Sequence, residues 1–219
     1  GAYSQMALKE YFGEHTNSYH VETWRDAMEA IKNGEADYAV LPIENSSAGI
    51  VPENYDLLVE YDNCIVGEQI IKIDHALLGV KGAKLSDIDT VYSHPQALMQ
   101  CSKYLEEHRE WDKKSLKNTA ASAQKIQQDG RKNQAAIANI KTADIYGLEV
   151  LDEAIQNNQD NSTRFIIVTG KKIYEKNAGK ISICFEVPHE SGSLYHMLSH
   201  FIYNDLNMNK IESRPVEGQ

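Results

Sequence analysis

Apolar residues recur along the chain at two spacings, and stretches with helical spacing alternate with short runs typical of strands. A spacing of three or four predicts a helix over residues 24–33, which begins after Thr23 in a capping box with Asp26. The continuous apolar run at 36–43 predicts a buried strand, and Pro52 suits the first turn of the next helix. Local pattern alone therefore predicts a helix, a strand and a helix in succession.

The same alternation continues further along the chain. Residues 65–80 are rich in β-branched and apolar side chains and predict two strands that meet near Asp74, where we expect the chain to cross between two lobes. Further helices are expected to begin at Pro95 and at a Thr or Asn cap in residues 118–119. Alternating strands and helices favour a mostly parallel α/β sheet, in which the turns at the carboxyl ends of strands border a ligand crevice.

The last fifty residues have a different character. Residues 169–180 are polar and basic with two glycines, and we interpret them as a linker. Beyond the linker, the pattern predicts a strand at 180–187, an amphipathic helix at 194–202 and a second strand at 207–215. Such a unit needs partner strands to cover its sheet, so we expect the sequence to be trimmed at both ends.

Composition excludes several classes of protein. With 42% hydrophobic and 25% charged residues, the 219-residue chain is expected to fold as one large or two modest globular domains. The formal net charge of −10 and the absence of a basic stripe argue against binding to nucleic acid or to an anionic membrane, and no apolar run approaches the ~20 residues of a membrane span. Three widely separated cysteines favour a reducing cytoplasm.

Four turns are rich in small polar residues, and we interpret them as candidate binding elements. They read "ENSS" at 44–47, "SHPQ" at 93–96, "NTAAS" at 118–122 and "NSTR" at 161–164. Two of them precede predicted helices, whose amino ends present unpaired N–H groups that suit carboxylates or phosphates. Each turn taken alone is equally typical of a helix cap worth about 1 kcal/mol. The composition of the turns therefore indicates an α/β protein that binds a small anion.

Three side chains in these turns have alternative interpretations. Glu44 is either a buried acid or a hydrogen-bonded structural carboxylate, and His94 either donates to an anion or positions the following helix. Arg164 has a planar guanidinium that matches a carboxylate, or it belongs to a surface ion pair. Glycine-rich phosphate loops, nucleophile elbows and zinc-binding spacings are absent from the sequence, so we expect chemistry without a cofactor or a metal.

Taken in order, seven segments resemble the prephenate dehydratase family. They are "GAYSQMA", "LPIENSSAG", "YSHPQALMQC", "NTAASA", "NSTRF", "GSLY" and "KIESRP", and together they span residues 1–215. The resemblance implies a two-lobed α/β catalytic region like a type II periplasmic binding protein, followed by an α+β ferredoxin-like ACT domain that is truncated here. The implied boundaries are 1–176 for the catalytic region, about 1–73 and 156–176 for lobe 1, about 74–155 for lobe 2, and 177–219 for the incomplete ACT domain.

The resemblance also implies roles for individual residues. The threonine of the "TRF" motif, Thr163, is the family residue most closely tied to catalysis, and Glu44, Ser93 and His94 are expected to assist it. The residues expected to contact the substrate are Asn45, Ser46, Thr119, Ala120, Arg164, Phe165 and Ser4. The residues expected to bind phenylalanine are Gly192, Ser193, Leu194, Glu212, Ser213, Arg214 and Pro215.

The implied reaction converts prephenate to phenylpyruvate with loss of water and carbon dioxide, in L-phenylalanine biosynthesis. We expect Thr163 to hydrogen-bond the departing hydroxyl, with Glu44 as the other candidate proton donor, and loops from both lobes to meet in one pocket. L-phenylalanine is expected to act as an effector, and the ACT domains to join subunits into a dimer or a tetramer. Arogenate dehydratase and a non-catalytic carboxylate-binding module remain open alternatives, as does fusion to an upstream chorismate mutase domain.

Overall fold

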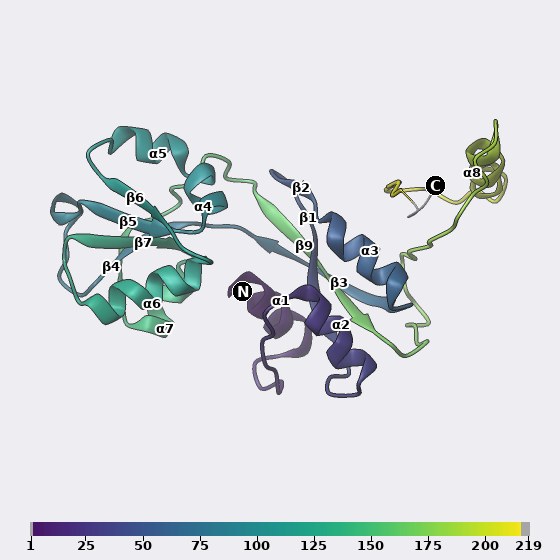
Figure 1. Cartoon of the computed structure of the whole chain (residues 1–219), viewed down its shortest axis with the longest axis horizontal. Coiled ribbons are helices and arrows are strands. Elements are labelled where there is room, and N and C mark those ends of the chain that lie inside the picture. Colours follow the sequence, from purple (N-terminus) through teal and green to yellow (C-terminus); the bar gives the residue numbers. More distant parts are fainter. Residues whose placement is uncertain (1, 216–219) are drawn as a thin grey trace. The chain divides into compact units, whose positions relative to one another are not determined.

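The computed structural model describes residues 2–215, and the strands of these residues form two separate sheets (Figure 1). The strands of sheet A are β1 (Ala39–Asn45), β2 (Gly49–Ile50), β3 (Cys64–Lys72) and β9 (Ser162–Thr169). The strands of sheet B are β4 (Ala76–Gly79), β5 (Thr90–Ser93), β6 (Asp112–Ser115), β7 (Gln134–Ala138) and β8 (Glu149–Asp152). We call sheet A with its helices lobe 1 and sheet B with its helices lobe 2.

The expectation of mostly parallel sheets is wrong. Sheet A has the strand order β2-β1-β9-β3, and every pair in it is antiparallel. Sheet B has the order β6-β5-β7-β4-β8, and only the pairs of β5 with β6 and with β7 are parallel. The reason is the path of the chain: β9 enters sheet A on its return from lobe 2, and therefore runs against both β1 and β3.

The helices follow the predicted alternation with the strands. Lobe 1 contains α1 (Ala2–Phe12), α2 (Trp24–Lys32) and α3 (Pro52–Glu60). Lobe 2 contains the 3₁₀ helix η1 (Leu85–Asp87), α4 (Pro95–Gln100), α5 (Ser102–Glu107), α6 (Thr119–Asp129) and α7 (Lys141–Tyr146). The predicted capping box is confirmed: the Thr23 hydroxyl accepts from the backbone N–H of Asp26, and the Asp26 carboxylate accepts from that of Thr23.

Both faces of sheet A are covered by apolar side chains. Phe165 on β9 packs with Ala7 of α1 and Ile71 of β3, whereas Ile166 packs with residues of α2 and α3 that include Met28 and Leu57. Successive side chains of a strand point to opposite faces, so β9 supplies both clusters in turn. This alternation decides which neighbours of Thr163 share its face of the sheet.

Sheet B is covered in the same way. One cluster joins Leu77 and Val91 to Cys101 and Trp111 on the side of α4 and α5. The other cluster joins Leu78, Tyr92, Ala136 and Ala138 to residues of α6 and α7. All five residues of β7 are buried, as expected of a central strand with helices on both faces.

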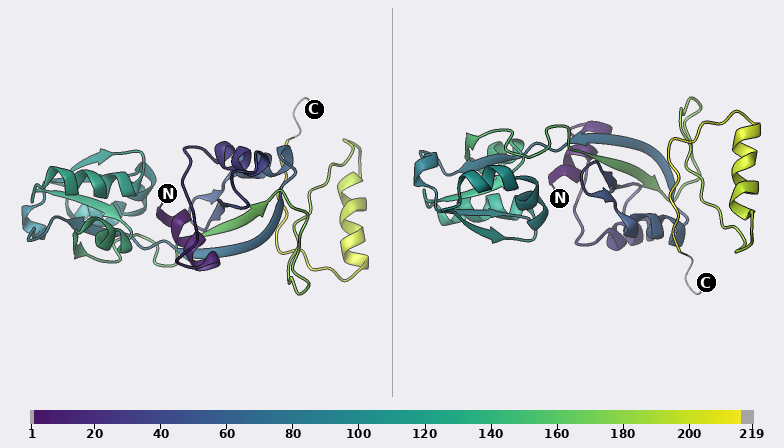
Figure 2. Two further views of the ribbon diagram at one scale, coloured as in Figure 1. Left: turned by 90° about the horizontal axis from the view of Figure 1, so that it is seen from below. Right: turned by 90° about the horizontal axis from the view of Figure 1, so that it is seen from above.

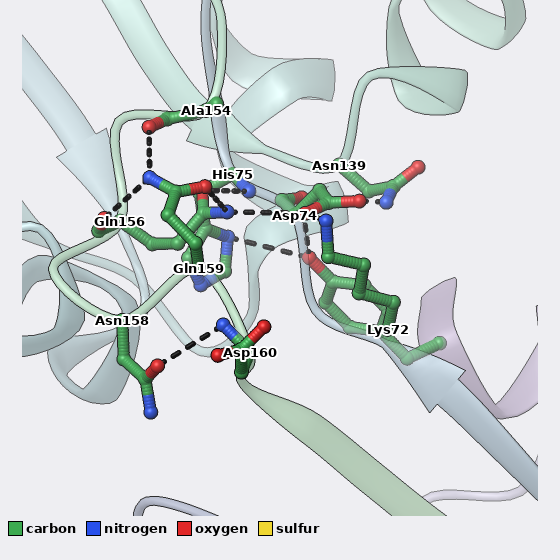
Figure 3. Close-up of polar contacts among 10 residues, drawn as sticks. Lys72, Asp74, His75, Asn139, Ala154, Gln156, Asn158, Gln159 and Asp160 are labelled. Carbon is green, nitrogen blue, oxygen red and sulfur yellow. Dashed lines mark hydrogen bonds and ion pairs between the residues drawn. The ribbon is translucent and has the colours of Figure 1, made fainter.

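The chain crosses twice between the two sheets. The first crossing joins β3 to β4 around Asp74, and the second returns from β8 to β9 past Gln156. The buried Gln156 carboxamide connects them: Oε1 accepts from the backbone N–H of His75 at 2.9 Å, and Nε2 donates to Asp74 Oδ1 at 3.0 Å (Figure 3). The first crossing lies between Lys72 and Ala76, and the second between Asp152 and Ser162. Residues 73 and 156, where the lobe boundaries were expected, lie in these two segments.

The chain divides into two compact units, Gly1–Ile173 and Tyr174–Gln219, so the division lies inside the segment predicted as a linker. Figure 2 shows the described part of the second unit as one yellow-green helix, α8 (Ser193–Tyr203), with extended chain on either side. The predicted strands at 180–187 and 207–215 are wrong, since residues 174–215 contain no strand. Extended segments without a pairing partner leave their N–H and C=O groups to water, so alternation alone does not form a sheet.

Residues 174–215 therefore do not form the sheet of the ferredoxin-like ACT domain that the family resemblance implied. α8 corresponds to the predicted amphipathic helix, but none of its residues is buried. Within residues 2–215, no helix has both the length and the apolar character needed to span a membrane.

Candidate active site

The end of β1 and the start of β9 lie side by side and carry most of the candidate residues of lobe 1. Their antiparallel register pairs Asn45 with Thr163 and Glu44 with Arg164. Since neighbouring side chains on a strand point to opposite faces, Asn45 and Thr163 share one face of sheet A, and Glu44 and Arg164 share the other. The motifs "ENS" and "TRF" are thus each divided between two faces.

A hydrogen-bonded group surrounds Thr163, and we call Asn45, Ser46, Asn161 and Thr163 the threonine cluster. Asn45 Nδ2 donates to Thr163 Oγ1 at 2.9 Å and to Asn161 Oδ1 at 3.0 Å. Asn45 Oδ1 accepts from the backbone N–H groups of Ser47 and Ala48, at 3.0 and 2.8 Å. These two backbone donors fix which way the Asn45 amide faces, because only its oxygen is able to accept from them.

The orientation of Asn45 determines what Thr163 offers chemically. A hydroxyl has one proton to donate and two lone pairs to accept with, and Asn45 occupies one of the lone pairs. The proton of Thr163 is therefore not engaged by Asn45 and is available to another acceptor. With only 9% of Thr163 exposed, the hydroxyl lies where a hydrogen bond to developing charge is stronger than in water.

Arg164 and Glu44 do not join this cluster. Arg164 Nη2 lies 3.3 Å from Glu44 Oε2, and Arg164 Nη1 lies 3.3 Å from Glu68 Oε2 on β3. Two carboxylates thus engage the guanidinium that was expected to hold a substrate carboxylate, and the ion-pair alternative for Arg164 describes the geometry. Glu44, the other candidate proton donor, lies on the same face as Arg164 and away from Thr163.

Phe165 also has a different place from the one expected. Phe165 is 3% exposed and packs with Ala7, Ile71 and Ile73 in the core under α1. Phe165 therefore supports β9 from within the core. Ser4 lies on α1 and is half-buried.

Ser93 and His94 belong to lobe 2, where both make local contacts. The fully buried Ser93 hydroxyl donates to the carbonyl of Ile137 at 2.7 Å and so joins β5 to β7. His94 precedes α4, and its Nδ1 accepts from the backbone N–H of Gln96 at 3.2 Å. The alternative in which His94 positions the following helix matches this contact.

The start of α6 carries the remaining candidates of lobe 2. Asn118 caps the helix, with its Oδ1 accepting from the backbone N–H of Ala121 at 2.7 Å. Thr119 and Ala120 are the first two residues of the helix and are half-buried. Because the cap engages Ala121, the N–H groups of Thr119 and Ala120 are the ones that a helix start directs outward.

The candidates thus fall into three groups: the threonine cluster, the Glu44 and Arg164 pair on the opposite face of sheet A, and the lobe 2 residues. Sequence reasoning did not single out Asn161, although this residue opens the "NSTR" motif and stands two positions before Thr163. A separation of two places side chains on the same face of a strand, which is the signal that identifies it.

A second polar group at the first crossing was also missed. The Tyr3 hydroxyl donates to the carbonyl of Asp74 at 3.0 Å and lies 3.3 Å from His75 Nδ1, while His75 Nε2 lies 2.8 Å from Gln100 Oε1. Burial raises the pKa of Tyr3 and lowers the pKa of His75, so at neutral pH Tyr3 is a protonated donor and His75 is uncharged. This group joins α1 of lobe 1 to α4 of lobe 2.

Comparison with known proteins identifies the family to which the chain is similar. The family model described as "Prephenate dehydratase" matches residues 1–173. The chain is 35% identical over 224 residues to the bifunctional chorismate mutase/prephenate dehydratase of Escherichia coli (strain K12), with 100% of this chain and 58% of that protein covered. It is 39% identical over 217 residues to arogenate dehydratase/prephenate dehydratase 1, chloroplastic, of Arabidopsis thaliana, with 98% and 55% covered.

A solved structure extends the comparison to three dimensions. The crystal structure of prephenate dehydratase in complex with L-Phe from Arthrobacter aurescens has a TM-score of 0.82 and 30% sequence identity, with 99% of this chain and 74% of that chain covered. The chain spans less than two thirds of the length of the Escherichia coli and Arabidopsis relatives.

Proposed function

The chain belongs to the prephenate dehydratase family, and from this premise we propose that it converts prephenate to phenylpyruvate. In this reaction the C–C bond to the ring carboxylate breaks and carbon dioxide leaves. The electron pair of that bond moves into the ring, and the C–O bond to the ring hydroxyl breaks. The departing hydroxide takes up a proton to become water. The ring becomes aromatic, which supplies the driving force.

The hydrogen bond from Asn45 Nδ2 to Thr163 Oγ1 is the observation that carries the proposal. Asn45 donates to Thr163 Oγ1, so the threonine proton is available to an oxygen outside the cluster. A hydroxyl is a weak acid, and we assign Thr163 a hydrogen bond to the departing oxygen as negative charge builds on it. A preorganised donor of this kind typically contributes about 10²–10³ in turnover.

Prephenate carries two carboxylates that also need partners. We propose that the N–H groups of Thr119 and Ala120 hold one of them, because the start of α6 combines outward N–H groups with the positive end of a helix dipole. We leave Arg164 out of this role, since Glu44 and Glu68 already engage its guanidinium. In lobe 1, Asn45 and Ser46 complete the set of polar groups beside Thr163.

The direct test is turnover. The purified protein is incubated with prephenate, and the formation of phenylpyruvate is followed by its absorbance, with the Thr163→Val variant as control. Wild-type protein is expected to form phenylpyruvate and the variant to form it far more slowly. Binding of prephenate without turnover, measured by calorimetry on the same sample, would instead identify a carboxylate-binding module.

Arogenate is the second candidate substrate, and the 39% identity to the Arabidopsis arogenate dehydratase/prephenate dehydratase favours testing it. Arogenate has an amine where prephenate has a keto group, so its product is phenylalanine. Comparing kcat/KM for the two substrates decides which one the protein prefers. A higher value for arogenate would overturn the assignment to prephenate.

We further propose that L-phenylalanine regulates the activity, which the L-Phe complex of the Arthrobacter relative supports. The residues proposed to bind it lie at the start of α8 and in the extended segment before residue 216: Gly192, Ser193, Leu194, Glu212, Ser213, Arg214 and Pro215. Coupling between sites is typically about 1–3 kcal/mol, so apparent substrate affinity is expected to change by roughly fivefold to 150-fold. A saturation curve unchanged by phenylalanine would contradict regulation.

Self-association and location complete the proposal. We propose that the C-terminal segment joins subunits, because its helix α8 leaves Leu194, Ile202 and other apolar side chains exposed. Light scattering with and without phenylalanine measures the assembly, and a monomer under both conditions would contradict it. We also propose a cytoplasmic location, which fractionation tests and which the three unpaired cysteines favour.

A further inference from the structure

Asn161 lies where the second crossing meets β9, and the residue is only 1% exposed. Asn161 Oδ1 accepts from Asn45 Nδ2 at 3.0 Å and from Ser46 Oγ at 3.2 Å. We propose that Asn161 is a positioning residue for the dehydration. Together with the backbone donors that hold Asn45 Oδ1, Asn161 positions the Asn45 amide so that an N–H reaches Thr163 Oγ1, which leaves the threonine proton for the departing oxygen. This inference rests on the function proposed above.

The direction of each hydrogen bond in the cluster follows from its partners. Ser46 Oγ already accepts from the backbone N–H of Ser162 at 2.9 Å, so its own proton is the one that reaches Asn161. Asn45 Oδ1 is occupied by backbone donors, so Asn45 also presents an N–H to Asn161. Two donors thus converge on one atom of Asn161, and only an acceptor satisfies them. The position requires an oxygen.

The backbone of Asn161 is anchored to the first crossing. Its carbonyl accepts from the backbone N–H of Ile73 at 2.8 Å, and its own N–H donates to the carbonyl of Asn158 at 3.3 Å. Ile73 directly follows β3 and precedes Asp74. Asn161 therefore connects the first crossing to the side-chain amide of Asn45, which contacts Thr163. In this role Asn161 does not itself contact the substrate.

Two substitutions separate an acceptor role from a general structural one. Asn161→Ala removes one of the acceptors that hold the N–H groups of Asn45 in place, while Ser47 and Ala48 still hold its oxygen, so kcat is expected to fall by about tenfold to hundredfold and KM to change by less than about threefold. Asn161→Asp keeps an oxygen at the same place. Its kcat is expected to stay within about threefold of the wild-type value at pH 8 and to fall toward that of the alanine variant as acid protonates the new carboxyl group.

Asn158 provides a matched control in the same loop. It is exposed, and its Oδ1 accepts from the backbone N–H of Asp160 at 3.0 Å (Figure 3). Its Nδ2 lies 3.4 Å from Ser47 Oγ. Asn158→Ala removes an amide of the same type that makes no contact with Asn45 or Thr163. Its kcat and KM are expected to match those of the wild type.

A measurement that does not depend on turnover uses the Asn45 side chain. In ¹⁵N-labelled wild-type protein, both protons of the Asn45 amide are hydrogen-bonded, so their resonances are expected to be separate and slow to exchange with water. In Asn161→Ala they are expected to move together and to exchange faster, and in Asn161→Asp at pH 8 to stay near the wild-type positions. Thermal unfolding of each variant shows that it is folded.

The outcomes distinguish this inference from the proposed function. A kcat unchanged in Asn161→Ala overturns the positioning role, and so does an equal loss in Asn161→Asp at every pH. A raised KM with unchanged kcat overturns it too, because Asn161 would then be a binding group. If wild-type protein forms no phenylpyruvate while the Asn45 resonances change as expected, the proposed function fails and the control of Asn45 by Asn161 stands.

Discussion

Replacing Thr163 by valine exchanges a hydroxyl for a methyl group of similar volume, and so tests the hydroxyl with little change in packing. In the folded protein one N–H of Asn45 loses its acceptor at 2.9 Å, a hydrogen bond worth about 1 kcal/mol. Two effects offset this loss. The carbonyl of Ser162 lies 3.1 Å from the same nitrogen, and burial of a methyl group contributes about 0.8 kcal/mol.

The net loss of stability in Thr163→Val is therefore expected to stay below about 1 kcal/mol, which lowers Tm by less than about 4 °C in a protein of this size. The loss of turnover is expected to be far larger. Without the donor, kcat should fall by about 10²–10³, equivalent to about 2.7–4 kcal/mol, with KM nearly unchanged. The two quantities thus differ enough to be separated experimentally.

The assay measures phenylpyruvate formation over a range of prephenate concentrations and compares it with thermal unfolding of the same samples. Thr163→Ser keeps a hydroxyl in place, and its kcat is expected to stay close to that of the wild type. Wild-type turnover in Thr163→Val would refute the role of the hydroxyl. If Thr163→Val lost kcat together with a large fall in Tm, the loss of turnover would reflect unfolding, and the prediction that the hydroxyl affects kcat far more than stability would be wrong.

Three further predictions concern other parts of the molecule. Arg164→Met is expected to leave KM within about threefold of the wild-type value and to lower Tm by a few degrees, because the arginine pairs with carboxylates away from Thr163; a strongly raised KM would return it to the substrate. Burial lowers the pKa of His75, so below pH ~6.5 the unfolded chain takes up a proton that the folded chain does not. The free energy of unfolding, measured with urea, should therefore fall from pH 7 to pH 5, and less so in His75→Gln. Burial also raises the pKa of the Cys101 thiol to about 12, so alkylation at pH 8 should modify the exposed Cys184 and leave Cys101 unreacted until the protein unfolds.

Local signals were sufficient to predict the early elements. The helix expected over residues 24–33 is α2 (Trp24–Lys32), and its capping box forms as expected. Apolar spacing and a cap depend only on residues within a few positions, so the sequence contains all the information they need. The crossing near Asp74 was predictable for a similar reason, since two apolar runs meet there at a polar residue.

Strand direction was not predictable in this way. Whether β9 runs parallel or antiparallel to β1 depends on where the chain returns from lobe 2, which is a non-local property. The strands expected at 180–187 and 207–215 were predicted from local alternation and do not form. Their residues alternate as in strands, but pairing needs a partner that residues 174–215 do not provide.

The candidate site was predictable as a set of motifs and not as a geometry. Thr163 and Asn45 lie together, whereas Arg164 and Glu44, their immediate neighbours in sequence, face the other way. A register irregularity between Pro42 and Glu44 contributes to this arrangement, and no sequence pattern marked it. Motif membership thus predicted a set of candidate residues, and strand pairing was needed to show which of them lie together.

The carboxamide of Gln156 ties the two crossings into a double-stranded joint. A single connecting segment would rotate freely about its backbone bonds, whereas two fastened segments resist torsion and still permit flexing. We therefore expect any movement of one lobe relative to the other to be a hinge rotation about a single axis. A shorter side chain in place of Gln156 would lose both contacts, and we expect the two lobes then to move relative to each other in more directions.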